Sequence, residues 1–322
     1  MAGTSIPASP SASGVGDGAS GMPANMGASH SGMLSMVGTP IGNLGDLTAR
    51  AAETFRAADV ICCEDTRVTS KLLSHLGISK PLLRCDDNVI ARRAPELVER
   101  VLAGERIAFA SDAGMPSVSD PGQVLVEHAR NEGAPVEVIP GPSACVTALV
   151  LSGIPSDQFF FEGFLPRKHG ERVRRLQRLA AIPGALIFYE SPHRAVDSLV
   201  AIAEVFPQRV VALCRELTKL HEEVLRAPAP ELLERVRERG ELKGEMVIVV
   251  APPSEEELDR LGAALAAGAS IGAPVDPDEL LRSDIAEGLA AGEPANALAK
   301  RLSQKHSRKK REVYNLVLEI QQ

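Results

Sequence analysis

Leu34-Ser35-Met36-Val37-Gly38-Thr39-Pro40-Ile41-Gly42-Asn43 is the stretch that indicates the fold most directly. Residues 34–37 are typical of a buried β-strand, because a short apolar run stops abruptly at glycine and proline. Asp46 and Thr48 then offer capping oxygens for a helix that continues to Ala57. A strand, a glycine turn and a helix in this order indicate the first unit of a parallel α/β sheet.

The alternation continues beyond this unit and predicts two α/β domains. Further strands are expected, with helical segments between them, at 59–63, 107–110, 136–139, 159–161, 185–189, 209–214 and 245–250. Gly153-Ile154-Pro155-Ser156 interrupts the pattern and predicts the domain boundary. The predicted organisation is a disordered leader at 1–32, α/β domains at 33–153 and 154–253, a linker at 254–278 and a basic helical tail at 279–322.

Composition favours a soluble cytoplasmic protein without a metal. Apolar residues make up 44% and charged residues 24% of the 322 residues, the balance of a globular chain. No apolar run reaches the roughly 18 residues of a membrane span, so we expect no membrane segment. The five cysteines form no CxxC pair and the histidines lack metal-ligand spacing, which disfavours a disulfide framework and a metal site.

Three glycine-rich turns, at 38–45, 111–122 and 140–144, each follow a predicted strand of the first domain. Parallel sheets collect ligands at the carboxyl ends of their strands, so the three turns together predict a crevice for a small molecule. Taken singly, a glycine turn is more often a plain connection than a binding loop. None matches the GxGxxG or GxxxxGK[ST] pattern, which disfavours a nicotinamide enzyme and a nucleotide hydrolase.

Eight ordered motifs resemble signatures of the tetrapyrrole methylase superfamily. Those in the first domain are Gly38–Leu44, Cys63–Arg67, 111–116 with 119–122, and Pro140–Ala144. Those in the second domain resemble the branch that methylates the ribose 2′-hydroxyl of a decoding-centre cytidine in 16S ribosomal RNA, and they are Glu162–Lys168, Tyr189–Arg194, Arg215–Lys219 and Lys243–Glu245. The resemblance covers about residues 33–250 and is weaker in the tail.

The resemblance implies two α/β domains with S-adenosylmethionine between them, a homodimer, and the small ribosomal subunit as partner. It implies cofactor contacts from residues of the glycine turns and of the second domain, namely Thr39, Pro40, Ile41, Asp112, Gly114, Met115, Pro142, Ser143, Tyr189 and Met246. One stretch departs from the family: Arg84-Cys85-Asp86-Asp87-Asn88 stands where its members have His-Glu-His-Asn, and only Asn88 matches.

A ribose hydroxyl is a weak nucleophile, so its methylation calls for a positioned base or for cations near the developing alkoxide. Polar residues that follow predicted strands of the second domain are the catalytic candidates: Glu190, His193, Arg215 and Glu216. Structural ion pairs are the alternative, with Glu190 bound to Arg194 and Arg215 bound to Glu216 or Glu64.

RNA binding is predicted from two basic clusters in a chain whose net charge is −7. The expected phosphate contacts are Arg167, Lys168, Arg308, Lys309, Lys310 and Arg311, with Ser307 as a helix cap beside the second cluster. Solvated helix faces are the alternative for both clusters. Two other functions also stay open: a tetrapyrrole C-methyltransferase, whose polycarboxylate substrate would also favour arginines, and a cofactor-binding module without activity.

Overall fold

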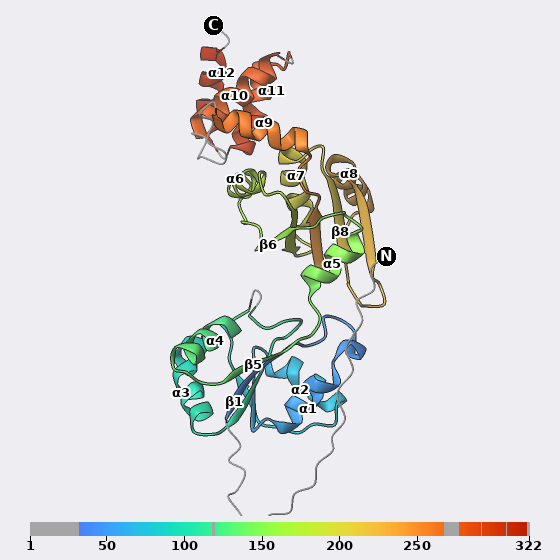
Figure 1. Ribbon diagram of the computed structural model, residues 1–322. Helices are drawn as coiled ribbons and strands as arrows, with labels where there is room; N and C mark the ends of the chain where they lie inside the picture. Colours follow the sequence, from blue (N-terminus) through green and yellow to red (C-terminus); the bar gives the residue numbers. More distant parts are fainter. Residues whose placement is uncertain (1–31, 118–119, 267–276, 291, 307, 321–322) are drawn as a thin grey trace, which may run out of the picture.

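The computed structural model describes residues 32–117, 120–266, 277–290, 292–306 and 308–320, which form two α/β lobes and a group of C-terminal helices (Figure 1). The predicted leader, apart from Gly32, lies outside the described residues, as do Ser307 and residues 267–276 of the predicted linker. Over the described residues, no helix combines the length and apolarity needed to cross a bilayer.

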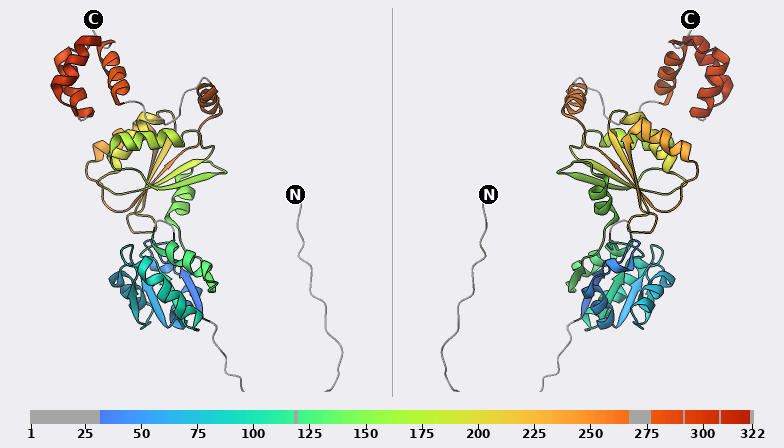
Figure 2. Two further views of the ribbon diagram at one scale, coloured as in Figure 1. Left: turned by 90° about the vertical axis from the view of Figure 1, so that its left-hand side faces the viewer. Right: turned by 90° about the vertical axis from the view of Figure 1, so that its right-hand side faces the viewer.

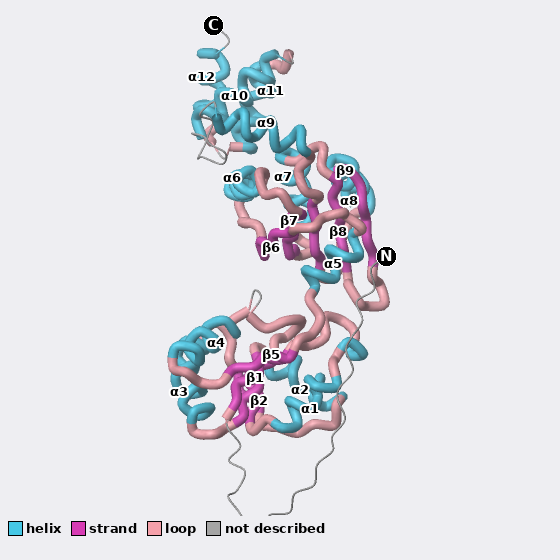
Figure 3. Tube along the Cα trace, viewed as in Figure 1, coloured by secondary structure: helices cyan, strands magenta, loops and turns pink. Residues whose placement is uncertain are grey.

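The first lobe is a parallel five-stranded sheet of order β3-β2-β4-β1-β5, with helices on both faces (Figure 3). In chain order its elements are β1 Met33–Val37, a 3₁₀ turn Leu44–Asp46, α1 Ala49–Ala57, β2 Val60–Cys63, α2 Thr66–His75, β3 Leu82–Arg84, α3 Ile90–Leu102, β4 Arg106–Ala110, α4 Gly122–Asn131 and β5 Val136–Ile139. The parallel sheet predicted from the opening stretch is confirmed. Thr48 caps α1 as predicted, because its hydroxyl accepts the Ala51 N–H at 3.1 Å.

Sequence patterns underestimate this lobe in two places. The segments α2 and β3 are not predicted: β3 is only three residues long and lies at the edge of the sheet, and α2 buries only Thr69, Leu72 and Leu73. Helix α3 begins at Ile90, five residues before Pro95, although proline favours the first turn of a helix. Ile90 and Ala94 extend its buried stripe backwards by more than a turn, and this packing outweighs the backbone hydrogen bond that Pro95 cannot donate.

The second lobe is a mixed sheet of order β6-β7-β10-β8-β9, in which β6 and β7 are parallel and the other neighbours antiparallel. In chain order its elements are α5 Ala144–Ser152, β6 Phe159–Phe164, α6 His169–Leu179, β7 Ala185–Glu190, α7 Ala195–Val205, β8 Val210–Arg215, β9 Glu223–Pro228, α8 Ala229–Arg239 and β10 Met246–Val250. The sequence misses β9, whose charged, half-exposed residues form the edge of the sheet. Helix α5 precedes the predicted boundary at Gly153, yet Cys145 and Ala148 pack into the core beneath this second sheet. The domain limits stay predictions.

The C-terminal helices form a small core of their own. They are α9 Glu255–Ala266, α10 Pro277–Ala290, α11 Ala295–Lys305 and α12 Lys310–Ile320, and the last three stand as a separate group in Figure 2. Apolar side chains of these three helices pack together and are fully buried: Leu281, Ile285, Leu298, Leu302, Val313 and Val317. Helix α9 is tied to the second lobe instead, because Glu257 binds the buried Arg209 at 2.6 Å.

Candidate functional site

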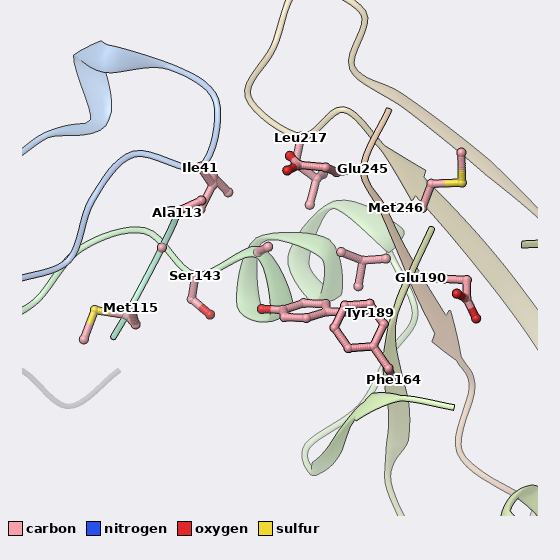
Figure 4. Close-up of a pocket in the computed structure, with 13 residues that line it drawn as sticks. Ile41, Ala113, Met115, Ser143, Phe164, Tyr189, Glu190, Leu217, Glu245 and Met246 are labelled. Carbon is pink, nitrogen blue, oxygen red and sulfur yellow. The ribbon is translucent and has the colours of Figure 1, made fainter. Parts of the chain in front are cut away.

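A cavity of about 190 Å³ lies where the carboxyl edge of the first sheet faces the second lobe (Figure 4). It is lined mainly by apolar side chains with a few polar groups: Ile41, Ala113, Gly114, Met115, Ser143, Ala144, Phe164, Tyr189, Glu190, Leu217, Glu245, Met246 and Val247.

The first-lobe wall of the cavity is made of backbone that approaches closely. Thr39 and Gly114 exchange two backbone hydrogen bonds of 2.9 and 3.1 Å, which join the turns after β1 and β4. Gly114 has φ +85°, and a Cβ there would lie 3.3 Å from Ile41. At the next turn a Cβ on Gly38 would lie 2.7 Å from Gly141. Glycine is therefore required for these turns to close around the cavity.

The second-lobe wall is built from strand ends. Tyr189 of β7 and Val247 of β10 are paired in register and both line the cavity. The Tyr189 ring packs edge-on against Phe161 and Phe164, at centroid distances of 4.7 and 5.9 Å. Ser143 faces the cavity from the start of α5, where its hydroxyl caps no helical N–H. An aromatic and aliphatic wall with two hydroxyls suits a ligand that is part planar ring and part polar chain.

The structure brings six of the ten predicted cofactor residues to this cavity: Ile41, Gly114, Met115, Ser143, Tyr189 and Met246. Thr39, Pro40 and Asp112 line a different hollow beside α2, on the first lobe. Pro142 lines a third hollow with Thr48 and Thr218. Residues of the same glycine turn thus line different hollows, although the turns contact one another.

Glu190 lies beside the cavity, but its carboxylate is directed away from the Tyr189 side of β7, as alternation along a strand requires (Figure 4). The carboxylate is fully buried and lies 3.4 Å from Arg194. It also accepts hydrogen bonds from the Ser198 hydroxyl at 2.5 Å and the Ser191 N–H at 2.9 Å. Arg194 in turn donates to the Leu165 carbonyl at 2.5 Å. Glu190 therefore anchors a buried network behind the cavity wall.

The other catalytic candidates have different environments, although Arg215 and Glu216 are adjacent in the chain. Arg215 binds Glu223 of β9 at 3.0 Å. The sequence does not predict this partner, because its pattern does not reveal β9. Glu216 binds Lys219 at 2.9 Å, and this ion pair lowers the pKa of the Glu216 carboxyl. His193 is exposed. Of the ion pairs considered as alternatives, the one between Glu190 and Arg194 is present, whereas Arg215 has a different partner from those named.

The residue pattern of a known family covers both lobes. The family model for tetrapyrrole (corrin/porphyrin) methylases matches residues 33–233. The chain belongs to the tetrapyrrole methylase family. A relative from Mesorhizobium japonicum, ribosomal RNA small subunit methyltransferase I, is 41% identical over 89% of this chain and 92% of its own length. The protein of the same name from Escherichia coli O157:H7 is 46% identical over 71% of this chain and 80% of its own.

Solved structures agree on the fold. A diphthine synthase superposes with a TM-score of 0.55 over 71% of this chain and 93% of its own, at 17% identity. The cobalt precorrin-4 methyltransferase gives a TM-score of 0.52 over 69% and 95%, at 15% identity. The predicted fold class, two α/β domains of tetrapyrrole methylase type followed by helices, is confirmed.

Acidic side chains cluster at the carboxyl edge of the first sheet in this tetrapyrrole methylase. The Asp112 carboxylate accepts the Asp65 N–H at 3.1 Å, and Glu64 lies 3.4 Å from the Asp112 N–H. Burial, and next the negative charge of Asp120, raise the pKa of Glu64 to about 7. Burial also raises the pKa of Asp112, whereas hydrogen bonds from Arg67 lower the pKa of Asp65 to about 2.

The raised pKa of Glu64 predicts a pH-dependent stability. Between the unfolded value of 4.5 and the folded value of about 7, the folded state binds one more proton, so the free energy of unfolding falls as pH rises through this window. Glu64→Gln removes the titration, and we expect a flatter stability profile from pH 5 to pH 8 by urea denaturation. Glu53→Gln, at an exposed position on α1, is the control. A slope in Glu64→Gln equal to that of the wild type contradicts the assignment.

The residues of the two predicted basic clusters are exposed, and Lys168 also makes an ion pair. Arg167 is exposed and follows β6, while Lys168 lies 3.2 Å from Glu171. Arg308, Lys309, Lys310 and Arg311 lie at the start of α12 and are all exposed. Among the described residues, no ion pair holds Lys309 or Lys310.

Sequence reasoning missed several residues of the cavity, above all Phe164, Leu217 and Glu245. All three lie in motifs that carry the family resemblance, but the residues predicted in or beside those motifs were others: Arg167 and Lys168, Arg215 and Glu216, and Met246. For Phe164 a signal was present. Gly163 lies inside a strand, and glycine in a strand often marks a bulge or a close approach.

Proposed function

We propose that the chain transfers a methyl group from S-adenosylmethionine to the ribose 2′-hydroxyl of a cytidine in 16S ribosomal RNA, within the small ribosomal subunit. The observation that carries this proposal is 41% identity over 89% of the chain to a protein named for methylation of small-subunit ribosomal RNA. The positions of the cavity and of the basic residues are consistent with it.

The cavity fits the proposed cofactor. A Cβ on Gly38 would meet Gly141 and one on Gly114 would meet Ile41, so these glycines let the turns pack closely enough to form the first-lobe wall of the cavity. In our proposal Ile41, Gly114, Met115 and Ser143 hold the cofactor from the first lobe and from the start of α5. Tyr189 holds it from the second lobe together with the backbone of Met246, whose side chain is buried on the Glu190 face of the sheet. When bound, S-adenosylmethionine supplies an electrophilic methyl group on a positively charged sulfur. Thr39, Pro40, Asp112 and Pro142 support the turns in this proposal, because they line neighbouring hollows.

The residues of the chain then contribute alignment and the exclusion of water, which dominate a displacement with an activated donor. The buried ion pair of Glu190 supports a positioning role for this carboxylate. Ion pairs of Arg215 and Glu216 support the same kind of role on the loop after β8. His193 is exposed and stays our candidate for accepting the hydroxyl proton.

The test is transfer of radiolabelled methyl groups to small ribosomal subunits that lack the modification. We expect label in 16S RNA that protects one site from alkaline cleavage, because alkaline cleavage requires a free 2′-hydroxyl. Free ribosomal RNA and uroporphyrinogen are offered in parallel. Label in the pigment would indicate a tetrapyrrole methyltransferase, and binding of the cofactor without transfer to any substrate would indicate an inactive module.

Charge reversal in the C-terminal module, the helices α10–α12, is expected to weaken RNA binding selectively. Lys309→Glu with Lys310→Glu removes two cations and adds two anions at the start of α12. We expect KM for the subunits to rise by about 10-fold or more at physiological salt, with a shallower salt dependence, while the Kd for S-adenosylmethionine is unchanged. Lys300→Glu, on the neighbouring helix, controls for a general change of charge. If the Kd for S-adenosylmethionine rises as much as KM for the subunits, the result contradicts an RNA-binding role for this module.

We also propose a cytoplasmic homodimer. Helix α5 is apolar on all sides: Cys145 and Ala148 are buried, whereas Val146 and Val150 are 47% and 76% exposed. A helix that is hydrophobic all round is normally covered, which supports a second copy on this face. The five cysteines are buried and free, which suits a reducing compartment. Sedimentation of the intact chain tests the dimer, and a monomer at micromolar concentration contradicts it.

A further inference from the structure

Strand β6 contains an irregularity that turns one aromatic ring toward the cavity. Phe161 pairs with Ile187 and Phe164 pairs with Tyr189, so three residues of β6 advance while β7 advances by two. Gly163, at φ +78°, makes this bulge possible. In a regular strand, residues three apart point to opposite faces, but the extra residue places Phe161 and Phe164 on the same face.

The extra residue of the bulge, Glu162, makes an ion pair with the helix that follows β6. Glu162 binds Arg175 of α6 through two hydrogen bonds of 2.5 and 2.6 Å. This pair fixes the bulge to the neighbouring helix. Bulges that re-aim a side chain are common beside active sites.

The ring of Phe164 is unusually accessible for its residue type. It is 55% exposed although it lines the cavity and packs edge-on against Tyr189 (Figure 4). The chain has eight Phe, two Tyr and no Trp, so an exposed ring at a cavity wall is a scarce feature. The edge-to-face contact with Tyr189 orients the ring and leaves surface available to a second planar group.

The segment that follows is held firmly and carries positive charge. Arg172, itself buried, donates to the carbonyls of Pro166 and Arg167 at 3.1 and 3.0 Å. Arg194 donates to the Leu165 carbonyl at 2.5 Å. The Arg167 side chain is exposed at the end of this segment. A ring and a cation on one rigid segment match a nucleotide, in which a planar base lies close to a phosphate.

We propose that Phe164 is the surface on which the base of the target nucleotide stacks after it leaves the RNA helix or loop, with Arg167 beside the adjacent phosphate. This inference rests on the proposed function and adds the residue that receives the base. Stacking on one aromatic side chain accepts any base, so it holds the nucleotide in place and leaves its identity to other contacts. The ribose is thereby presented to the cavity.

Kinetics on small ribosomal subunits test the stacking role. Phe164→Leu keeps an apolar side chain but removes the ring, and we expect kcat/KM for subunits to fall by about 5- to 150-fold. Phe164→Trp should retain activity within about threefold, because indole stacks at least as well. The Kd for S-adenosylmethionine should change less than twofold in both. Phe159→Leu, at an exposed ring at the other end of β6, is the matched control.

Phe164→Trp also creates a fluorescent reporter, because the wild-type chain has no Trp. With S-adenosylhomocysteine already bound, we expect further quenching by a short single-stranded RNA that carries one cytidine. The same strand with an abasic residue in place of the cytidine should not quench. Anisotropy of the labelled strands establishes that both are bound during the measurement.

These measurements distinguish the proposed methyl transfer from the stacking role of Phe164. Absence of methyl transfer by the wild type to subunits contradicts the proposed function. Transfer by the wild type together with full activity of Phe164→Leu contradicts the stacking role alone. Equal quenching by the abasic strand, or a parallel loss of cofactor affinity in Phe164→Leu, also overturns it, since the ring would then contact the backbone or the cofactor.

Discussion

Gly114→Val is expected to remove measurable binding of S-adenosylmethionine, with Kd raised by at least about 100-fold. Two effects add. The backbone at Gly114 has φ +85°, which a β-branched residue adopts only with strain. The added side chain would also meet Ile41 and the Pro142 carbonyl, which lie 3.3 and 3.5 Å from an ideal Cβ, so it must turn into the cavity or displace the turn.

Gly133→Val is the matched control for backbone strain. Gly133 has φ +73° and no atom within 4 Å of an ideal Cβ. It therefore bears a similar conformational cost on the surface, far from any cavity contact. Calorimetric titration measures binding, and circular dichroism measures folding of both variants. If Gly133→Val loses affinity as strongly as Gly114→Val, general destabilisation explains the result and the cavity is not the cofactor site.

Most of the first sheet and its glycine turns could be predicted from sequence, because both follow from local rules. A short apolar run ended by Gly and Pro is read from neighbours in the chain, and Thr48 caps α1 through a contact three residues away. The parallel arrangement then places the turns at one edge. These features depend only on residues that are close in the sequence.

The remainder depends on contacts between distant segments. Asp112 and Gly114 are two residues apart, yet they line different hollows, because Gly114 is paired with Thr39 of the turn after β1 and the chain changes side at this bridge. Likewise the partner of Arg215 is Glu223, on an edge strand whose short apolar run is interrupted by Arg226. Orientation within a turn and pairing across a sheet are properties of the assembled fold, and motif positions do not contain them.

The catalytic residues cannot be identified from the motif alone either, because their side-chain directions depend on the assembled fold. Glu190 and His193 belong to one motif that resembles the family, and the motif offers no reason to separate a buried carboxylate from an exposed imidazole. The structure separates them, because β7 ends at Glu190 and alternation directs that side chain behind the cavity wall. A variant of Glu190 therefore distinguishes positioning from proton transfer.

Glu190→Ala is expected to lower the free energy of unfolding by about 3 kcal/mol or more. The carboxylate is fully buried, and its loss leaves Arg194 without its anion and the Ser198 hydroxyl without its acceptor. Removing both charges, as in Glu190→Ala with Arg194→Met, should recover much of the loss, because no uncompensated charge then remains inside. Urea denaturation of the two single variants and the double variant gives the coupling free energy between the residues.

Glu190→Gln decides between the two roles, because it keeps the shape of the side chain and removes its charge. A positioning residue predicts that kcat for methyl transfer falls less than about tenfold, while KM for the subunits rises as the 165–167 segment loses its anchor. A proton acceptor predicts a loss of about 10²–10⁴ in kcat with KM unchanged, and loss of the acidic limb of the pH profile. Glu105→Gln, at a more accessible carboxylate that binds Arg100 beside the amino end of β4, controls for the general cost of breaking an ion pair. We expect the positioning result, since a carboxylate already engaged by Arg194, Ser191 and Ser198 faces away from the cavity in which the hydroxyl must lie.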